Sequence, residues 1–243
     1  MLYSVKPGQV SYGEAIGILL LENFAPYIPG DVANATSYKY PVRFQRVPGF
    51  SVERIMDHDM SAVDDLIRAA VTLQSEGVRA ITGDCGFMAL YQDRVKEAVR
   101  VPVFLSSLMQ IPFMRLIVGG GMKIGVVTAN ASSLDVEVLS RAGVEHPDEL
   151  VIEGLEKADH FSTAVFQEVG RLDTDLVEQE VLQTVQKLLE REPRIGAILL
   201  ECSLLPPYGA AVREATGLPV FDYMTMIDFV YSAVVKRKYQ GFM

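Results

Sequence analysis

The sequence is poor in the residues that cross-link a protein or bind metals. It contains two cysteines and three histidines in 243 residues. Two cysteines in a chain of this length do not form the dense disulfide framework of a small secreted domain. The histidines, His58, His146 and His160, are not spaced like a pair of metal ligands. These shortages argue against a disulfide scaffold and against a histidine metal centre, and we expect no bound metal and two free thiols.

Positive charge and long apolar runs are also scarce. The 22 lysines and arginines are outnumbered by 31 aspartates and glutamates, which gives a net charge of −9 and a pI near 4.9. A chain of this charge has no dense basic face for nucleic acid. The apolar stretch from Ala15 to Leu21 follows no basic region and stops at Glu22, so it predicts neither a signal peptide nor a membrane span. We therefore expect a soluble cytoplasmic protein that binds neither nucleic acid nor membranes.

The sequence does contain an internal repeat. Residues 80–104 align without a gap to residues 197–221, 117 positions later, with ten identical pairs. Roughly one or two identities would be expected by chance in a window of this size. One of these pairs is Cys85 and Cys202, the only two cysteines of the chain. The two thiols therefore hold the same position in two copies of one unit.

The hydrophobic pattern predicts short buried strands that alternate with helices. Strands are expected near residues 16–21, 40–47, 80–84, 101–104, 123–130, 150–153, 195–202 and 218–221. Helices are expected at 53–75 with a break, at 87–98, at 106–118, after Ser132 or Ser133, at 173–190, from Pro206, and at 224–236. Short apolar strands between helices are typical of parallel sheets that are covered on both faces.

Combined with the repeat, this pattern predicts an α/β fold of two pseudo-symmetric three-layer lobes with parallel sheets and an active-site cleft between them. We place the first lobe at residues 1–105 plus 218–243 and the second at residues 106–217.

Each cysteine ends a predicted buried strand and precedes a predicted helix. Ligands gather at the carboxyl edge of a parallel sheet, and a helix N-terminus favours the thiolate form of a cysteine. Two thiols that face one cleft from opposite sides can remove a proton from one face of a carbon and return a proton to the other face. We therefore interpret Cys85 and Cys202 as the acid and base of a racemase or epimerase.

The cysteine pair is also compatible with roles that involve no proton transfer. Two buried core cysteines could be matched by duplication alone, because a free cysteine is usually a small buried hydrophobe. A redox pair lacks the Cys-x-x-Cys motif. A non-catalytic protein that closes two lobes on a small carboxylate would use the same scaffold.

The motifs Gly83-Asp84-Cys85-Gly86-Phe87, Leu200-Glu201-Cys202-Ser203 and Gly125-Val126-Val127-Thr128, together with the duplication, resemble the aspartate/glutamate racemase superfamily. That superfamily includes hydantoin racemases, maleate isomerases and arylmalonate decarboxylases. The resemblance implies cofactor-independent proton transfer at a carbon alpha to a carboxylate or carbonyl, with a small carboxylate as substrate. Decarboxylation and cis-trans isomerisation are the alternative reactions within the same superfamily. A homodimer or larger homo-oligomer is also consistent with it.

The resemblance further implies which residues bind the substrate. They follow each cysteine, lie in the loop after the 123–130 strand, and follow the first strand: Gly86, Phe87, Ser203, Leu204, Thr128, Ala129, Asn130, Glu22 and Asn23. Asp84 and Glu201 precede the cysteines and would bind a substrate ammonium group, or else serve as solvated or capping carboxylates.

The chain departs from the usual amino-acid racemase pattern after both cysteines and after the first strand. That pattern has Asn-Thr at positions 86–87, Thr-His at 203–204, and Asp-Ser at 22–23. The apolar side chains of Phe87 and Leu204 predict a site less polar than one built for glutamate.

Overall fold

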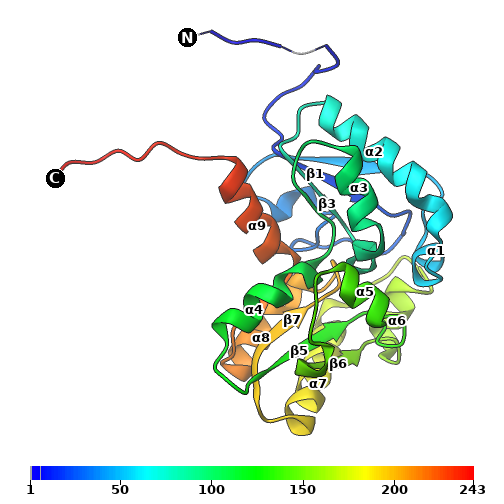
Figure 1. Cartoon of the computed structure of the whole chain (residues 1–243). Coiled ribbons are helices and arrows are strands. Elements are labelled where there is room, and N and C mark those ends of the chain that lie inside the picture. Colours follow the sequence, from blue (N-terminus) through cyan, green and yellow to red (C-terminus); the bar gives the residue numbers. More distant parts are fainter. Residues whose placement is uncertain (1, 6) are drawn as a thin grey trace.

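In the computed structural model, which describes residues 2–5 and 7–243, the chain forms two α/β lobes (Figure 1). The first lobe holds a parallel sheet of order β2-β1-β3-β4, and the second a parallel sheet of order β6-β5-β7-β8. The strands of the first sheet are β1 (Ile16–Leu20), β2 (Val42–Arg46), β3 (Ala80–Gly83) and β4 (Val103–Phe104). Those of the second are β5 (Lys123–Thr128), β6 (Leu150–Gly154), β7 (Ile195–Leu200) and β8 (Val220–Phe221). The predicted α/β fold with two parallel sheets is confirmed.

Nine α-helices of the described residues flank these sheets. They are α1 (Val52–Met56), α2 (Val63–Ser75), α3 (Gln92–Ala98), α4 (Ile111–Ile117), α5 (Val136–Arg141), α6 (Asp159–Val165), α7 (Thr174–Arg191), α8 (Gly209–Thr216) and α9 (Tyr223–Val234). The helix α7 shows why they form: the Asp173 carboxylate caps its first turn, and Val177, Val181 and Leu188 turn inward. In the part of the chain that is described, no helix is both long and apolar enough to cross a membrane.

The register of the strands extends the repeat beyond the sequence match. In the first sheet Ile16 of β1 pairs with Ala80 of β3, and in the second Ile124 of β5 pairs with Ala197 of β7. Since Ala80 and Ala197 are a repeat pair, Ile16 corresponds to Ile124. The residues that follow β1 and β5, Leu21 and Ala129, are equivalent for the same reason.

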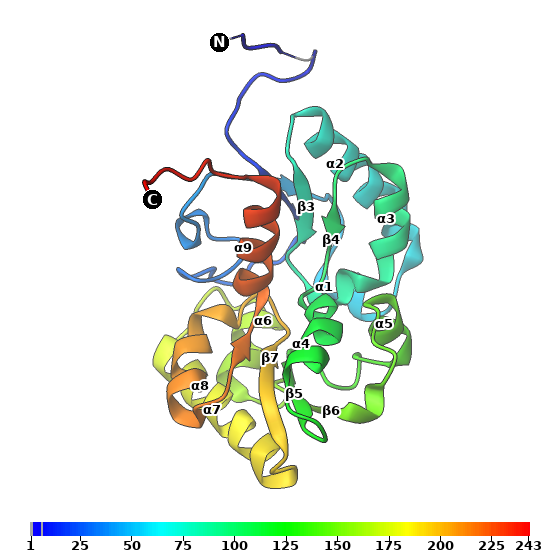
Figure 2. The same ribbon diagram turned by 60° about the vertical axis from the view of Figure 1, so that its left-hand side comes forward.

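Helices α4 and α9 connect the two lobes. The helix α4 follows a strand of the first sheet but packs on β5 of the second, whereas α9 follows β8 but packs on Ile16, Ile18 and Ala80 of the first (Figure 2). Within the range 218–243 that we expected in the first lobe, β8 therefore belongs to the second sheet and α9 covers the first. One apolar cluster also runs from Leu73 of the first lobe to Leu199 of the second, so the lobes share part of their core.

Three local expectations differ from the structure. Residues 87–98 form a 3₁₀ helix at Gly86–Tyr91 before α3, because the Met88 N–H bonds to the Cys85 carbonyl three residues back. Neither Ser132 nor Ser133 caps the next helix, since the Asp135 carboxylate accepts from the Val138 N–H instead. The short helix α6 was not expected from the sequence. It buries Phe161 and Val165.

Candidate active site

The two cysteines lie at equivalent points of the two sheets. Strand β3 is followed by Asp84 and Cys85, and strand β7 by Glu201 and Cys202. Both strands are central in their sheets. Both cysteines are free, and both line one cavity between the lobes, where the carboxyl ends of the two sheets meet. The repeat therefore brings the two thiols to a common site.

Ten of the thirteen residues expected at the site line this cavity. They are Asn23, Asp84, Cys85, Gly86, Phe87, Ala129, Glu201, Cys202, Ser203 and Leu204. The volume of the cavity is about 30 Å³, far below the ~300–1,000 Å³ of most ligand pockets. The structure thus represents a closed site, and a substrate requires it to open.

The three remaining residues lie outside the lining, and of the side-chain hydrogen bonds they make to described residues only that of Thr128 reaches a lining residue. Thr128 is fully buried, and its hydroxyl donates to Glu201 Oε2 at 2.8 Å. The Glu22 carboxylate accepts from Arg46 Nε at 2.6 Å and from the Gly49 N–H at 2.9 Å. Asn130 Oδ1 accepts from the Ser132 N–H at 2.9 Å, which closes the turn after β5.

The ionisation of the thiols differs from the sequence prediction. The backbone N–H of Phe87 lowers the pKa of Cys85, as expected for a cysteine before a helix, and the Leu204 N–H does the same for Cys202. Burial outweighs these amides and raises the pKa of both thiols, and the charge of Glu201 raises both further. The expectation that helix N-termini favour the thiolates is wrong for the closed site, where both cysteines are neutral thiols.

The acidic residues before the cysteines make equivalent contacts in the two lobes. The Asp84 carboxylate accepts from the Leu21 N–H at 3.0 and 3.2 Å, and Glu201 accepts from the N–H of Ala129, the equivalent residue. Asp84 is 4% exposed and Glu201 is 0% exposed, so neither is a solvated carboxylate. Burial raises the pKa of each carboxyl to about 7.

Gly86 departs from the family pattern because Glu201 takes the space of its side chain. A Cβ at position 86 would lie 1.5 Å from Glu201 Oε1. Glu201 belongs to the second lobe, and Gly86 follows the cysteine of the first. An asparagine at position 86 is therefore incompatible with the position of Glu201.

Six residues that line the cavity were missed by sequence reasoning. They are Leu21, Tyr27, Val52, Met56, Val165 and Phe166. Tyr27 lies in the loop after β1, and its hydroxyl contacts the Asn23 carbonyl at 3.3 Å. The Asn23 side chain in turn donates to the Val165 carbonyl across the cleft at 3.1 Å. These contacts depend on the approach of the lobes, which no local pattern encodes.

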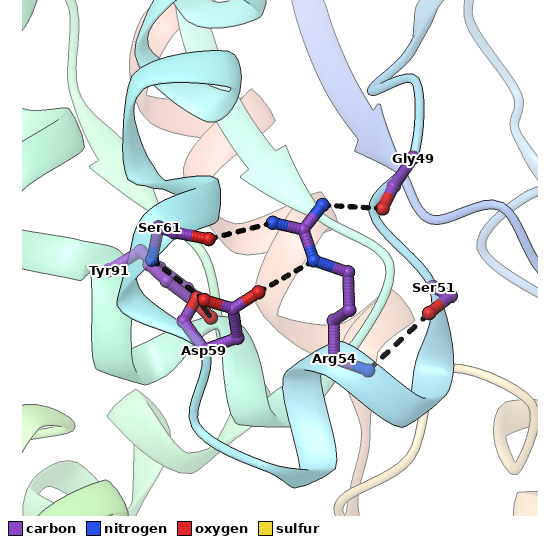
Figure 3. Close-up of polar contacts among 6 residues, drawn as sticks. All are labelled: Gly49, Ser51, Arg54, Asp59, Ser61 and Tyr91. Atoms are coloured by element: carbon purple, nitrogen blue, oxygen red, sulfur yellow. Dashed lines mark hydrogen bonds and ion pairs between the residues drawn. The ribbon is translucent and has the colours of Figure 1, made fainter.

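Val52 and Met56 come from the short helix α1, which a polar cluster holds in place (Figure 3). Arg54 donates to Asp59 Oδ2 at 2.7 Å, to the Gly49 carbonyl at 2.6 Å, and to Ser61 Oγ at 3.0 Å. The cluster ties both ends of the segment 49–61 together over the cavity. This segment is a candidate for the part that moves when the site opens.

The cavity offers acids and thiols but no fixed cation. None of the described residues that line it is a lysine or arginine. Nowhere in the described part of the chain do three or more His, Cys, Asp or Glu side chains gather around a position for a metal ion. The polar groups at hand are the two carboxyls, the two thiols, the side chains of Asn23, Tyr27 and Ser203, and the backbone amides beside the thiols.

Known proteins resemble this chain over most of its length. The family model for Asp/Glu/Hydantoin racemase matches residues 45–227. A dimethylsulfoniopropionate lyase from Durusdinium sp. clade D is 32% identical over 222 residues, covering 88% of this chain and 73% of that protein. Dimethylsulfoniopropionate lyase 5 from Emiliania huxleyi is 33% identical over 231 residues, covering 90% of this chain and 45% of that protein. The chain thus spans less than half the length of this second relative.

Among solved structures, an allantoin racemase from Pseudomonas fluorescens has the same fold. Its TM-score is 0.62 at 17% identity, and the match covers 91% of each chain. Given the family match, the similarity to the Durusdinium lyase and the duplicated two-lobe fold, the chain belongs to the Asp/Glu/hydantoin racemase family.

Proposed function

We propose that this enzyme is a lyase that cleaves dimethylsulfoniopropionate or a closely similar 3-sulfoniopropionate. A base removes the proton from the carbon alpha to the carboxylate. The electron pair of that C–H bond forms the carbon–carbon double bond, and the bond between the β carbon and sulfur breaks. The products are dimethyl sulfide, acrylate and one proton.

The composition of the cavity lining is the observation that carries this proposal. Its aromatic side chains, Tyr27, Phe87 and Phe166, suit a sulfonium cation, because a cation is attracted to aromatic faces. None of the described lining residues is a lysine or arginine that would repel a cation. The relatives named dimethylsulfoniopropionate lyase add support, since they match about nine tenths of this chain.

The two cysteines supply the base. Either Cys85 or Cys202, as a thiolate, can take the alpha proton and become a thiol. The backbone amides of Gly86 and Ser203, beside the thiols, are candidates to hold the substrate carboxylate and the negative charge that develops on it. An elimination needs a single base, whereas a racemisation needs a group on each face. We therefore do not expect the two cysteines to contribute equally.

The neutral state of the thiols fits a cationic substrate. Desolvation opposes a lone thiolate in the closed cavity. A sulfonium group beside the sulfur would favour the thiolate by direct charge attraction, and it would do so most strongly in a closed, dry site. In this mechanism the substrate itself helps to generate the base that attacks it.

The test is to incubate the purified protein with dimethylsulfoniopropionate and to measure dimethyl sulfide in the headspace together with acrylate in solution. We expect equal amounts of both products. Cys85→Ser and Cys202→Ser are then compared. The substitution that removes the catalytic base should lower the rate by about 10²- to 10⁴-fold. The other substitution should lower it less and serves as the control. Failure of the wild-type enzyme to release dimethyl sulfide would refute the proposal.

A racemase is the second candidate, because both thiols line one cavity. It predicts exchange of the alpha hydrogen of a chiral carboxylate in deuterated water, without release of a sulfide. It also predicts that both serine variants lose inversion completely.

A further inference from the structure

The two halves of the site differ at the acidic residue before each cysteine. Both oxygens of Asp84 contact the N–H of Leu21, within its own lobe. Glu201 is longer by one methylene group; its Oε2 accepts from the Thr128 hydroxyl, and the Ala129 N–H also bonds to the carboxylate. Its Oε1 is fully buried and has no hydrogen-bond partner among the described residues. A buried carboxylate oxygen without a partner is costly, which favours a functional role for it.

This free oxygen reaches across the cleft into the first lobe. It lies against Gly86, the residue after Cys85, at a place that any side chain there would occupy. The equivalent contact in the other direction, between Ser203 after Cys202 and Asp84 before Cys85, does not involve a carboxylate. There the Ser203 hydroxyl donates to the Asp84 backbone carbonyl. Cys85 thus has a free carboxyl oxygen from the opposite lobe near it, while the Asp84 carboxylate, the equivalent group for Cys202, is taken up within its own lobe.

We propose that Glu201 accepts the proton of the Cys85 thiol, so that Cys85 is the base and the two residues act as a pair across the cleft. In this step the S–H bond breaks, its electron pair stays on sulfur, and the proton binds Glu201 Oε1. The thiolate then takes the alpha proton of the substrate, and Glu201 loses its proton to solvent when the site opens. The choice of substrate rests on the proposed function, but the Cys85–Glu201 pair does not.

The electrostatics of the site agree with this geometry. After burial, the charge of Glu201 is the largest effect that raises the pKa of Cys85, and it ranks equally for Cys202. The choice of Cys85 therefore rests on the position of Glu201 Oε1 beside Gly86. A Cys85 thiolate and a Glu201 carboxylate therefore disfavour each other, and the two groups tend to share one proton. The other titratable groups around the pair are Asp84, Cys202, Tyr27, Tyr91 and Tyr223.

Two hydrogen bonds fix the backbone of Glu201, and a residue that accepts a proton across the cleft must be held in place in this way. Its N–H donates to the Val127 carbonyl at 2.8 Å, and its carbonyl accepts from Ser107 Oγ at 2.6 Å. With Thr128 on the second carboxylate oxygen, the side chain has little freedom to turn away from Gly86. Gly86 and Thr128 are thus the residues that position Glu201.

The pH dependence of Glu201→Gln separates this role from a structural one. At pH 7 we expect kcat/KM of Glu201→Gln to fall by about 10²-fold, and by at least tenfold more than that of the matched variant Asp84→Asn. The activity of Glu201→Gln should recover as the pH approaches the thiol pKa, because the thiolate then forms without an acceptor. A variant that retains wild-type activity at pH 7, or one whose loss is the same at every pH, would overturn the proposal.

Two further measurements complete the experiment. In substrate-free protein, alkylation of Cys85 by iodoacetamide, followed on its peptide by mass spectrometry, should have its midpoint at lower pH in Glu201→Gln, because a like charge is removed. This readout tests the pair even if dimethylsulfoniopropionate is not the substrate. Gly86→Ala should lower the activity of the wild type, but it should lower the activity of Glu201→Gln only slightly further. If the two losses were additive, Gly86 and Glu201 would not act in the same step.

Discussion

The ionisation of Glu201 should reduce the stability of the folded protein, and Glu201→Gln should remove that cost. Burial raises the pKa of this carboxyl from 4.5 to about 7. Between pH 4.5 and about pH 7, this carboxyl is protonated in the folded protein but ionised in the unfolded chain. The free energy of unfolding therefore falls as the pH rises through this window. Since one pKa unit corresponds to about 1.4 kcal/mol, the cost above pH 7 is about 3 kcal/mol.

Urea unfolding of wild type and Glu201→Gln between pH 4 and pH 8 measures this effect. The variant should gain stability relative to wild type as the pH rises, by about 3 kcal/mol over the whole range. A constant offset is expected as well, because the amide N–H₂ takes the place of Oε1 and is left without an acceptor. The control is Glu97→Gln, the same substitution at an exposed position. The reasoning would be refuted if the difference between Glu201→Gln and wild type stayed constant from pH 4 to pH 8.

Three further outcomes are expected. Tyr27→Leu should raise KM for the sulfonium substrate by about 5- to 30-fold, because it removes an aromatic face from the cation. The KM of Tyr27→Phe should stay close to that of the wild type. If both substitutions raised KM equally, Tyr27 would not bind the cation through its ring. Gly17→Ala should lower the free energy of unfolding by about 1–3 kcal/mol, because its Cβ would meet Leu73 at 2.9 Å. Gly125→Ala should lower it less, since the nearest contact of its Cβ is 3.3 Å. Urea unfolding compares the two variants. Arg54→Met should raise KM and speed proteolysis of the segment 49–61 by releasing its ends, and an unchanged cleavage rate would show that the polar cluster does not hold this segment.

The parts of the site that could be predicted are those fixed by the repeat. A buried strand such as β3 places the residue after it at the sheet edge, so the positions of Cys85 and Cys202 followed from local pattern and duplication. The same argument placed Gly86 and Ser203 beside the thiols. Such predictions succeed because they depend on strand direction alone, which does not change with the packing of the lobes.

The parts that could not be predicted depend on how the lobes meet. The prediction that Cys85 is a thiolate was wrong, because burial in the closed cavity raises the thiol pKa more than the adjacent N–H of Phe87 lowers it. Tyr27 was missed because it reaches the cavity from a loop without periodicity, and Phe166 because it follows α6, a helix the sequence did not indicate. In each case the missing information is a contact between segments far apart in the chain.

The repeat also suggests how the proposed elimination can use a scaffold that is suited to racemisation. Two equal halves bring two equivalent thiols to one carbon, and inversion needs both. Here the equivalence is broken by a glutamate where the first half has an aspartate, and by Gly86 where the second half has Ser203. One methylene group carries a carboxyl oxygen across the cleft to Gly86, the residue after the first cysteine, and the absent side chain makes room for it. A site with one assisted thiol favours removal of a proton over its return to the opposite face, and a substrate with a leaving group on the neighbouring carbon then proceeds to elimination.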